Sequence, residues 1–236
     1  MEHDISLLDH AFESEPTRFH YLPLPNSKGR IYLRPTDIVG ERGVVKWDSW
    51  FTELTLQDLI PITEEKLKGE WRFNNSLRVP WSVHSHAEVL RAFLHRLNGG
   101  RDTREHELYA VKHDSAEAYT RDIPTPFKTD VEREKEDAVF KAFGWPTISY
   151  EARMVAKRWD YIAAVAEALK FGWPQWTWPH RERERQQKAV DLYSDFLDTY
   201  IQTPEFRTAS WTQRVWDLTD GGRDMRPDIR PLNDSV

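Results

Sequence analysis

The stretch EARMVAKRWDYIAAVAEAL, residues 151–169, decides the fold class. Its apolar residues return at spacings of three and four, which is the period of one face of an α-helix. We therefore predict a long helix here that ends at Phe171-Gly172, because glycine commonly stops helices. The predicted buried face comprises Ala152, Val155, Trp159, Ile162, Ala166 and Leu169.

Helical periodicity continues on both sides of this stretch. Glycine or proline follows several of the segments, and Phe-Gly-Trp-Pro marks two predicted Gly-stopped helix ends, at 143–146 and 171–174. The expected helices are 52–68 as one or two pieces interrupted by Pro61, 85–97, 104–120, 129–143 with a capping box at Thr129 and Glu132, and 181–202.

The N-terminal residues differ from the rest. RFHYLPL, RIYLR and GVVKW, all within residues 18–47, are short β-prone runs separated by Pro, Asn and Gly. We expect a mainly α fold: a helical bundle with a small β-rich N-terminal portion and a helical C-terminal extension. The expected divisions of this single unit are 1–47, 48–172 and 173–236.

Composition narrows the function classes. The chain has 236 residues, a formal net charge of −6 and no cysteine, so disulfides and thiolate metal sites are excluded. The acidic balance argues against a partner that is a nucleic acid polymer. No stretch approaches the roughly 20 apolar residues that span a bilayer, and the N-terminus lacks a secretory pattern. We expect a cytoplasmic protein without a membrane partner.

Histidines and carboxylates gather in a suggestive pattern. His113-Asp114 lies in a helical segment, with Glu117 on the same face and Asp122 just beyond it. Asp160 stands at the edge of the buried face of 151–169, where a carboxylate costs free energy unless it is paired or metal-bound.

Each of these residues also has a simpler interpretation. Ser85 and Glu88 fit a capping box, which would make His86 a mere first-turn residue. His113-Asp114 fits a surface pair, and Asp160 fits a salt bridge to a neighbouring Lys or Arg. Only the combination and order of these residues favour a metal site.

That order resembles a known family. His86, then His113-Asp114, then Asp160 is similar to the H…HD…D pattern of the HD superfamily of metal-dependent phosphohydrolases. HDSAEAYTRDIPTPFK (113–128) and WRFNNSLRVPWSVHSHAEV (71–89) resemble its 5′-deoxynucleotidase-like branch, which includes phage deoxynucleotide hydrolases. The likeness covers roughly residues 30–170. It departs at Arg121, where that branch usually has glycine, and at His84, an additional histidine.

The resemblance implies a site. Its metal ligands would be His86, His113, Asp114 and Asp160, a mixed nitrogen and oxygen set that suits a divalent ion such as Mn, Co, Mg or Fe. Proton transfer would fall to Glu117 and Asp122, in an order that the sequence leaves open. Substrate contacts would come from Arg72, Phe73 and Lys128.

The implied function is hydrolysis of a (deoxy)nucleotide, first as a 5′-monophosphate and alternatively as a triphosphate that releases tripolyphosphate. Relatives of this kind self-associate, so a homo-oligomer is expected. Two other classes remain open: a non-catalytic binding or assembly protein of the same shape, and an iron oxygenase using His86-x-Glu88 with His180. Trp173, Trp176 and Trp178 are expected mainly to pack in the core, with a base-stacking platform as the alternative.

Overall fold

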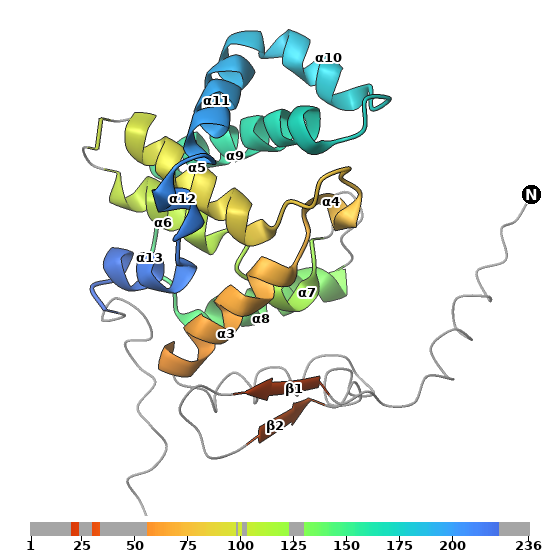
Figure 1. Cartoon of the computed structure of the whole chain (residues 1–236). Helices are drawn as coiled ribbons and strands as arrows, with labels where there is room; N and C mark the ends of the chain where they lie inside the picture. The colour runs from red at the N-terminus through yellow and green to blue at the C-terminus, as the bar shows by residue number, and fades with distance from the viewer. Residues whose placement is uncertain are drawn as a thin grey trace, which may run out of the picture.

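The computed structural model describes residues 20–23, 30–33, 56–97, 99–100, 103–122 and 130–221. This part of the chain is mainly helical, as predicted (Figure 1). The strands β1 (His20–Pro23) and β2 (Arg30–Leu33) pair antiparallel, with Tyr21 opposite Tyr32. The rest of the β-rich portion expected over 1–47 lies outside the described residues.

The long helix α9 (Tyr150–Phe171) is the centre of the bundle and begins at a Ser149 cap, whose side chain accepts the Ala152 amide. α5 (Val83–Leu97), α6 (Arg104–Lys112) and α11 (Gln187–Tyr200) pack against it. The predicted apolar face of α9 is correct except at Val155, which is 41% exposed because buried Ala156 takes its place. α9 therefore presents small residues inward, which lets the neighbouring helices approach.

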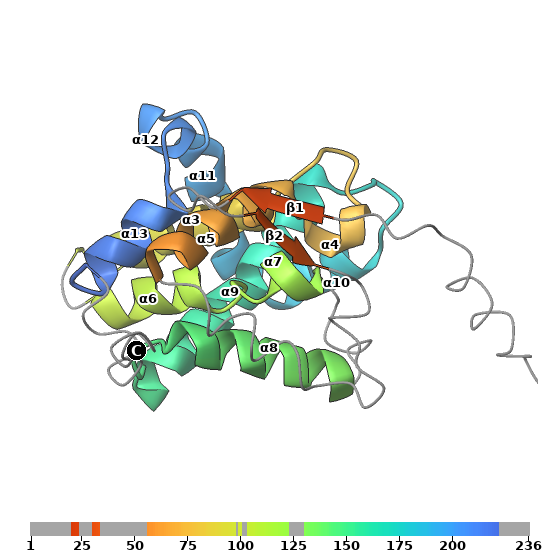
Figure 2. The ribbon, with the colours of Figure 1, turned by 90° about the horizontal axis from the view of Figure 1, so that it is seen from below.

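Two apolar clusters hold the bundle together. The first, between α5, α9 and α11, contains Phe93, Ile162, Tyr193 and Leu197 among its members. The second lies at the other end and joins α3 (Leu56–Gly69) and α8 (Asp130–Phe143) to α13 (Trp211–Leu218), with α7 (Glu117–Thr120) packed on α3 and α8 (Figure 2). Helices beyond residue 173 thus complete both clusters.

One of the predicted segments forms a single helix, and two others are divided. The segment 52–68 forms the single helix α3 within the described residues, because Pro61 removes only one backbone hydrogen bond near its start. The segment 104–120 breaks after α6. The segment 181–202 divides at Gln186 (φ −126°) into α10 (Trp178–Arg185) and α11. The charged run at 181–185 carries no apolar stripe that would continue the helix. Thr129 of the expected capping box lies outside the described residues.

Short elements connect these helices. α4 (Arg72–Asn75) is a single turn, and α12 (Pro204–Arg207) begins at a Thr203 cap. No helix in the described residues combines the length and apolar character that crossing a membrane requires.

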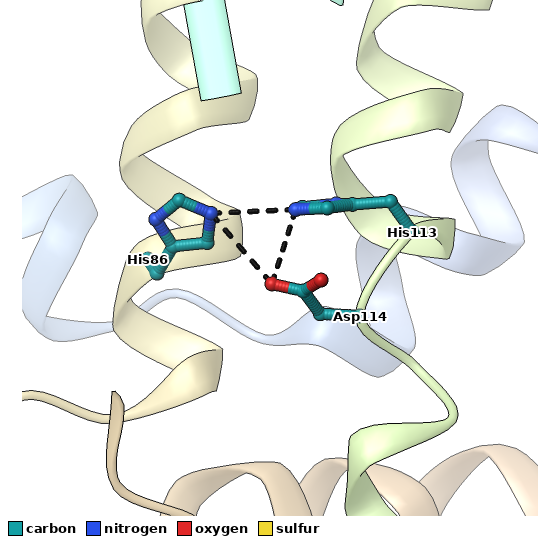
Figure 3. Close-up of side chains that lie close together, drawn as sticks. All are labelled: His86, His113 and Asp114. Carbon is teal, nitrogen blue, oxygen red and sulfur yellow. Dashed lines mark hydrogen bonds and ion pairs between the residues drawn. The ribbon is translucent and has the colours of Figure 1, made fainter. Parts of the chain in front are cut away.

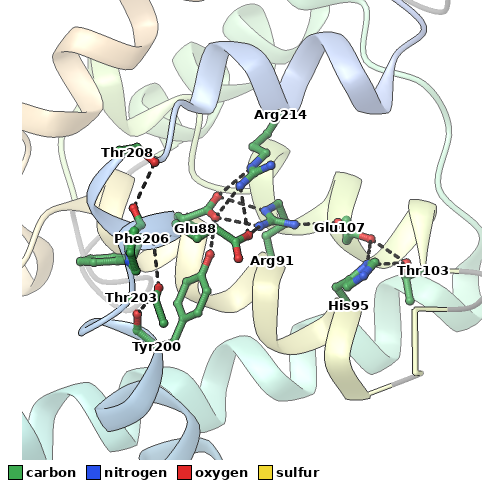
Figure 4. A network of polar contacts seen from close by, with 12 residues as sticks. Glu88, Arg91, His95, Thr103, Glu107, Tyr200, Thr203, Phe206, Thr208 and Arg214 are labelled. Carbon is green, nitrogen blue, oxygen red and sulfur yellow. Dashed lines mark hydrogen bonds and ion pairs between the residues drawn. The ribbon is translucent and has the colours of Figure 1, made fainter.

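Buried charges also join the helices (Figure 4). Arg91 on α5 binds Glu88 at 2.7 Å and Glu107 of α6 at 2.9 Å, and Glu88 accepts the Tyr200 hydroxyl of α11 at 2.8 Å. Because Glu88 is occupied in this network, the capping box at Ser85–Glu88 is wrong. Ser82 caps the helix instead, accepting the Ser85 amide at 3.1 Å.

Candidate metal centre

His86 is placed by the first turns of α5. The helix begins at Val83, so its fourth residue points into the bundle, and the His86 side chain is fully buried. Its Nδ1 atom lies 2.8 Å from Glu167 Oε1. Neighbouring His84 points elsewhere, toward Glu64 on α3 at 3.7 Å. The choice of His86 over His84 therefore agrees with the geometry.

His113 and Asp114 occupy the turn between α6 and α7. The backbone at His113 is still helical (φ −59°, ψ −39°), but the Ser115 hydroxyl donates to the Lys112 carbonyl at 2.7 Å. Such a side-chain bond competes with the helix ladder. The turn directs the side chains of His113 and Asp114 toward one point. In a regular helix, the side chains of two adjacent residues diverge and could meet at one ion only along the edge of a helix face.

His86, His113 and Asp114 form a group that could hold a metal ion, since their ligand atoms all lie within 4.8 Å of one another (Figure 3). The two Nε2 atoms are 3.3 Å apart, and Asp114 Oδ2 lies 3.1 Å from His113 Nε2 and 3.7 Å from His86 Nε2. Ligands of an octahedral ion at about 2.1 Å are roughly 3 Å apart along an edge. The observed spacings are slightly wider.

Asp160 joins this group from α9. Its Oδ1 atom lies 3.2 Å from His86 Nε2 and 3.4 Å from His113 Nε2. It contacts both imidazoles, yet it is not among the three residues whose ligand atoms are all mutually close.

The tautomers of the two histidines follow from their partners. His113 Nδ1 lies 3.0 Å from the Ala110 carbonyl and 3.2 Å from the Tyr109 carbonyl, while His86 Nδ1 faces a carboxylate. These oxygens only accept, so each Nδ1 carries a proton and each neutral ring presents its Nε2 lone pair. Two lone pairs and two carboxylates then converge, an arrangement that requires a proton or a cation between them.

The pKa values also indicate that positive charge is favoured between the imidazoles and the carboxylates. Burial lowers the pKa of His113, but Asp114 and Asp160 outweigh it and raise the pKa well above its usual value. Burial raises the pKa of Asp114, yet His113 and Arg72 bring it down to about 2. The pKa of Asp160 is likewise far below its usual value despite burial, because His113 and His86 face it. A bound divalent cation would replace these protons.

Arg72 lies beside the cluster. Its NH1 group donates to Asp114 Oδ2 at 3.1 Å, and its Nε atom is 3.6 Å from Glu167 Oε2. Burial lowers its pKa, but four carboxylates, Asp114, Glu167, Asp122 and Glu117, raise it above the ordinary value. The guanidinium therefore remains charged in the buried site.

The turn after Arg72 is strained. Phe73, Asn74 and Asn75 all have positive φ, at 57°, 50° and 57°. Asparagine tolerates this region, but for a bulky residue such as Phe it is a genuine outlier. The Phe73 amide donates to the Asp122 carboxylate, which holds the turn in place. Arg72 and Phe73 thereby lie next to each other beside the cluster.

Glu117 and Asp122 are both buried, at 5% and 7% exposure. The Asp122 amide donates to Glu70 Oε1 at 3.1 Å, and burial raises the pKa of its carboxyl group. The preceding Arg121 has φ 71° and ψ 163°, a region that is essentially reserved for glycine. Lys128, the remaining predicted substrate contact, lies outside the described residues.

Glu167 was missed by the sequence analysis. It lies two helical turns after Asp160 on α9, is fully buried and contacts both His86 and Arg72. The available signal was a glutamate inside the apolar run IAAVAEAL, where a carboxylate needs a partner. Glu88, by contrast, turns away into the network of Figure 4, which opposes the oxygenase alternative.

The site thus combines two imidazoles, a surrounding set of carboxylates and one buried guanidinium, which suits binding of a divalent cation and an anionic group together. Comparison with models of known protein families, with curated proteins and with solved structures finds no match to this chain.

Proposed function

We propose that this protein is a metal-dependent phosphohydrolase that acts on a (deoxy)nucleotide, first of all a deoxynucleoside 5′-monophosphate. The observation that carries the proposal is the convergence of His86, His113, Asp114 and Asp160 beside the buried Arg72. The resemblance of the 113–128 segment to HD phosphohydrolases points the same way.

The four ligands would hold a divalent ion such as Mn, Co, Mg or Fe. When bound, such an ion supplies a Lewis acid for the phosphoryl group and lowers the pKa of a water molecule. Glu167 fixes the orientation of His86 by accepting its Nδ1 proton, as carboxylates behind metal-binding histidines commonly do.

Arg72 binds the phosphate in this proposal. One of its five N–H donors is occupied by Asp114, so others remain for phosphate oxygens. Its contact with Asp114 links phosphate binding to the metal ligands. Phe73 then lies against the sugar or base, which favours a deoxynucleotide by the family resemblance.

Glu117 and Asp122 carry the proton transfers. Hydrolysis of a phosphate ester needs one base to take a proton from the attacking water and one acid to protonate the leaving alkoxide. Asp122 suits the acid role because its burial raises its pKa. Glu117, only three residues from Asp114, suits the base role.

A hydrolysis screen with metal analysis tests the proposal. The purified protein, with Mn²⁺, Co²⁺ or Mg²⁺, is incubated with nucleoside and deoxynucleoside mono- and triphosphates. Asp114→Asn serves as the site variant, and Asp195→Asn, an exposed aspartate on α11, as the matched control. We expect turnover by the parent and the control and none by Asp114→Asn. Release of phosphate or of tripolyphosphate identifies the bond that is cleaved.

Two outcomes would contradict the proposal. Bound metal without turnover of any nucleotide would eliminate the nucleotide phosphohydrolase and favour a non-catalytic metal-binding protein. No bound metal after incubation with any of the three ions would eliminate the metal centre itself.

A further inference from the structure

A cavity opens beside Phe73, the residue that follows Arg72 of the candidate metal centre. It has a volume of about 520 Å³ and is lined by Phe73, Gln175, Trp176, Thr177, Trp178 and Pro179. Small-molecule sites typically measure roughly 300–1,000 Å³ and are lined by aromatic side chains with a few polar groups. Figures 1 and 2 show α4 and the start of α10 at the same edge of the bundle.

Phe73 connects this cavity to the metal centre. Its ring centroid is 5.4 Å from the Arg72 guanidinium carbon, and that guanidinium donates to Asp114. The same ring meets Trp176 and Trp178 edge to face, with centroids 6.3 Å and 6.4 Å away. A group bound at Arg72 therefore has aromatic surface immediately next to it.

The backbone holds the two walls of the cavity together. The amides of Arg78 and Val79 donate to the Phe171 carbonyl at the end of α9, at 2.9 Å and 3.2 Å. This ties the segment that follows the Phe73 turn to the end of α9, where the α9–α10 loop begins. In that loop a Cβ on Gly172 would lie 2.2 Å from the Ala168 carbonyl oxygen and 3.1 Å from Trp176. Glycine is needed at 172 because a side chain there has no room. Its backbone conformation does not require glycine, since a φ of −78° is open to any residue.

The tryptophans are not simply core residues. Trp178 is 44% exposed and Trp173 is 45% exposed, so the prediction that they mainly pack in the core is wrong for both. Trp178 lines the cavity, whereas Trp173 does not. A large aromatic side chain left half exposed beside a charged site has surface available for a planar ligand.

We propose that Phe73, Trp176 and Trp178 form a binding site for the planar base of the nucleotide whose phosphate lies at Arg72. The occupant is an aromatic heterocycle stacked against this group of rings, and Gln175 and Thr177 supply polar groups for its edge. This inference rests on the proposed function, because it assigns the base of the same substrate. It also gives residues after 173 a part in substrate selection.

The test compares substrates with and without a base. Rates are measured with Mn²⁺ for the four 2′-deoxynucleoside 5′-monophosphates and for 2-deoxyribose 5-phosphate. The variants are Trp178→Ala, Trp178→Phe and the matched control Trp173→Ala. We expect Trp178→Ala to lower kcat/KM for the nucleotides by about tenfold or more, the loss typical of removing one base-stacking ring. The base-free sugar phosphate should change less than twofold.

Rescue by Trp178→Phe and an unchanged Trp173→Ala would show that stacking, not folding, is responsible. Equal losses for nucleotides and base-free sugar phosphate, or no loss for either, would overturn the base site while leaving the phosphohydrolase intact.

A binding measurement separates the two proposals if nothing is hydrolysed. Tryptophan fluorescence is titrated with the four 2′-deoxynucleosides, which lack a phosphate. Quenching that disappears in Trp178→Ala but persists in Trp173→Ala would support the base site even though the proposed reaction had failed. Absence of any binding would overturn the base site as well.

Discussion

Glu167→Gln tests whether the carboxylate behind His86 tunes the metal centre. Glutamine has nearly the same shape and can still accept the His86 Nδ1 proton through its amide oxygen. It lacks the negative charge, and when its oxygen faces His86 its NH₂ group faces the Arg72 Nε, which lies 3.6 Å from the present carboxylate. The substitution thus removes charge while largely preserving volume and one hydrogen bond.

The expected loss is in metal affinity. Changes to the partner behind a metal-binding histidine typically cost 10- to 100-fold, or about 1.4–2.7 kcal/mol. Because Glu167 is fully buried and contacts both His86 and Arg72, we expect about 30-fold, near the middle of that range. The melting temperature of the metal-free variant should fall as well, because the buried Arg72 and His86 lose a negatively charged partner.

Isothermal titration with Mn²⁺ at fixed pH measures the effect. Glu151→Gln, an exposed glutamate in the first turn of the same helix, is the matched control and should bind like the parent. His86→Ala gives the full loss for comparison. A change below twofold for Glu167→Gln, with His86→Ala unable to bind, would refute the reasoning that Glu167 acts through His86.

Further predictions concern stability. Arg121→Gly should raise the melting temperature by about 2–4 °C. Glycine relieves strain at φ 71° worth about 1–3 kcal/mol, which outweighs the loss of about 0.5–1 kcal/mol in chain entropy. A melting temperature below that of the parent in calorimetry would show that the turn is unstrained. Arg91→Met removes the cation that the buried Glu88 and Glu107 share, leaving Arg214 beside Glu88 and His95 beside Glu107. It should lower the free energy of unfolding by about 3 kcal/mol in urea titration, the lower end of the range for breaking a buried ion pair; a loss under 1 kcal/mol would contradict this. Burial raises the pKa of both glutamates, but hydrogen bonds to neighbours such as Arg91 lower it below the usual value. Their stabilisation is therefore present above the unfolded pKa of about 4.3 and is lost as the pH falls through the folded pKa. Urea titrations across that window should show a decline that is shallower in Glu88→Gln, and parallel curves would contradict the assignment.

The sequence predicted the elements whose apolar stripe is continuous. α5 and α9 were recognised because their buried faces repeat at helical spacing and glycines follow them. The ends of α6 and α10 were missed because the breaks depend on a side-chain bond from Ser115 and on the charged run before Gln186. Those causes leave little trace in the periodicity.

The site residues likewise fall into those that the sequence could predict and those that it could not. His86, His113 and Asp114 could be predicted because their types and order are unusual, and the structure brings their ligand atoms together. Glu167 could not, since only the packing of α5 against α9 shows that it meets His86. Nor does the sequence show that the Phe73 turn is left-handed, since the Asp122 carboxylate that accepts the Phe73 amide comes from a distant part of the chain.

The helices beyond residue 173 make this chain hard to shorten. Val190 and Leu197 fill one apolar cluster and Trp211 and Val215 the other, so removing them would expose the inner faces of α5 and α9. The contacts of these C-terminal helices with α5 join residues that are far apart in sequence, so they form only after long loops have closed. We therefore expect the described helices to fold together as one unit. A fragment ending at residue 172 would retain every proposed metal ligand and still lack the packing that holds those ligands at a fixed separation.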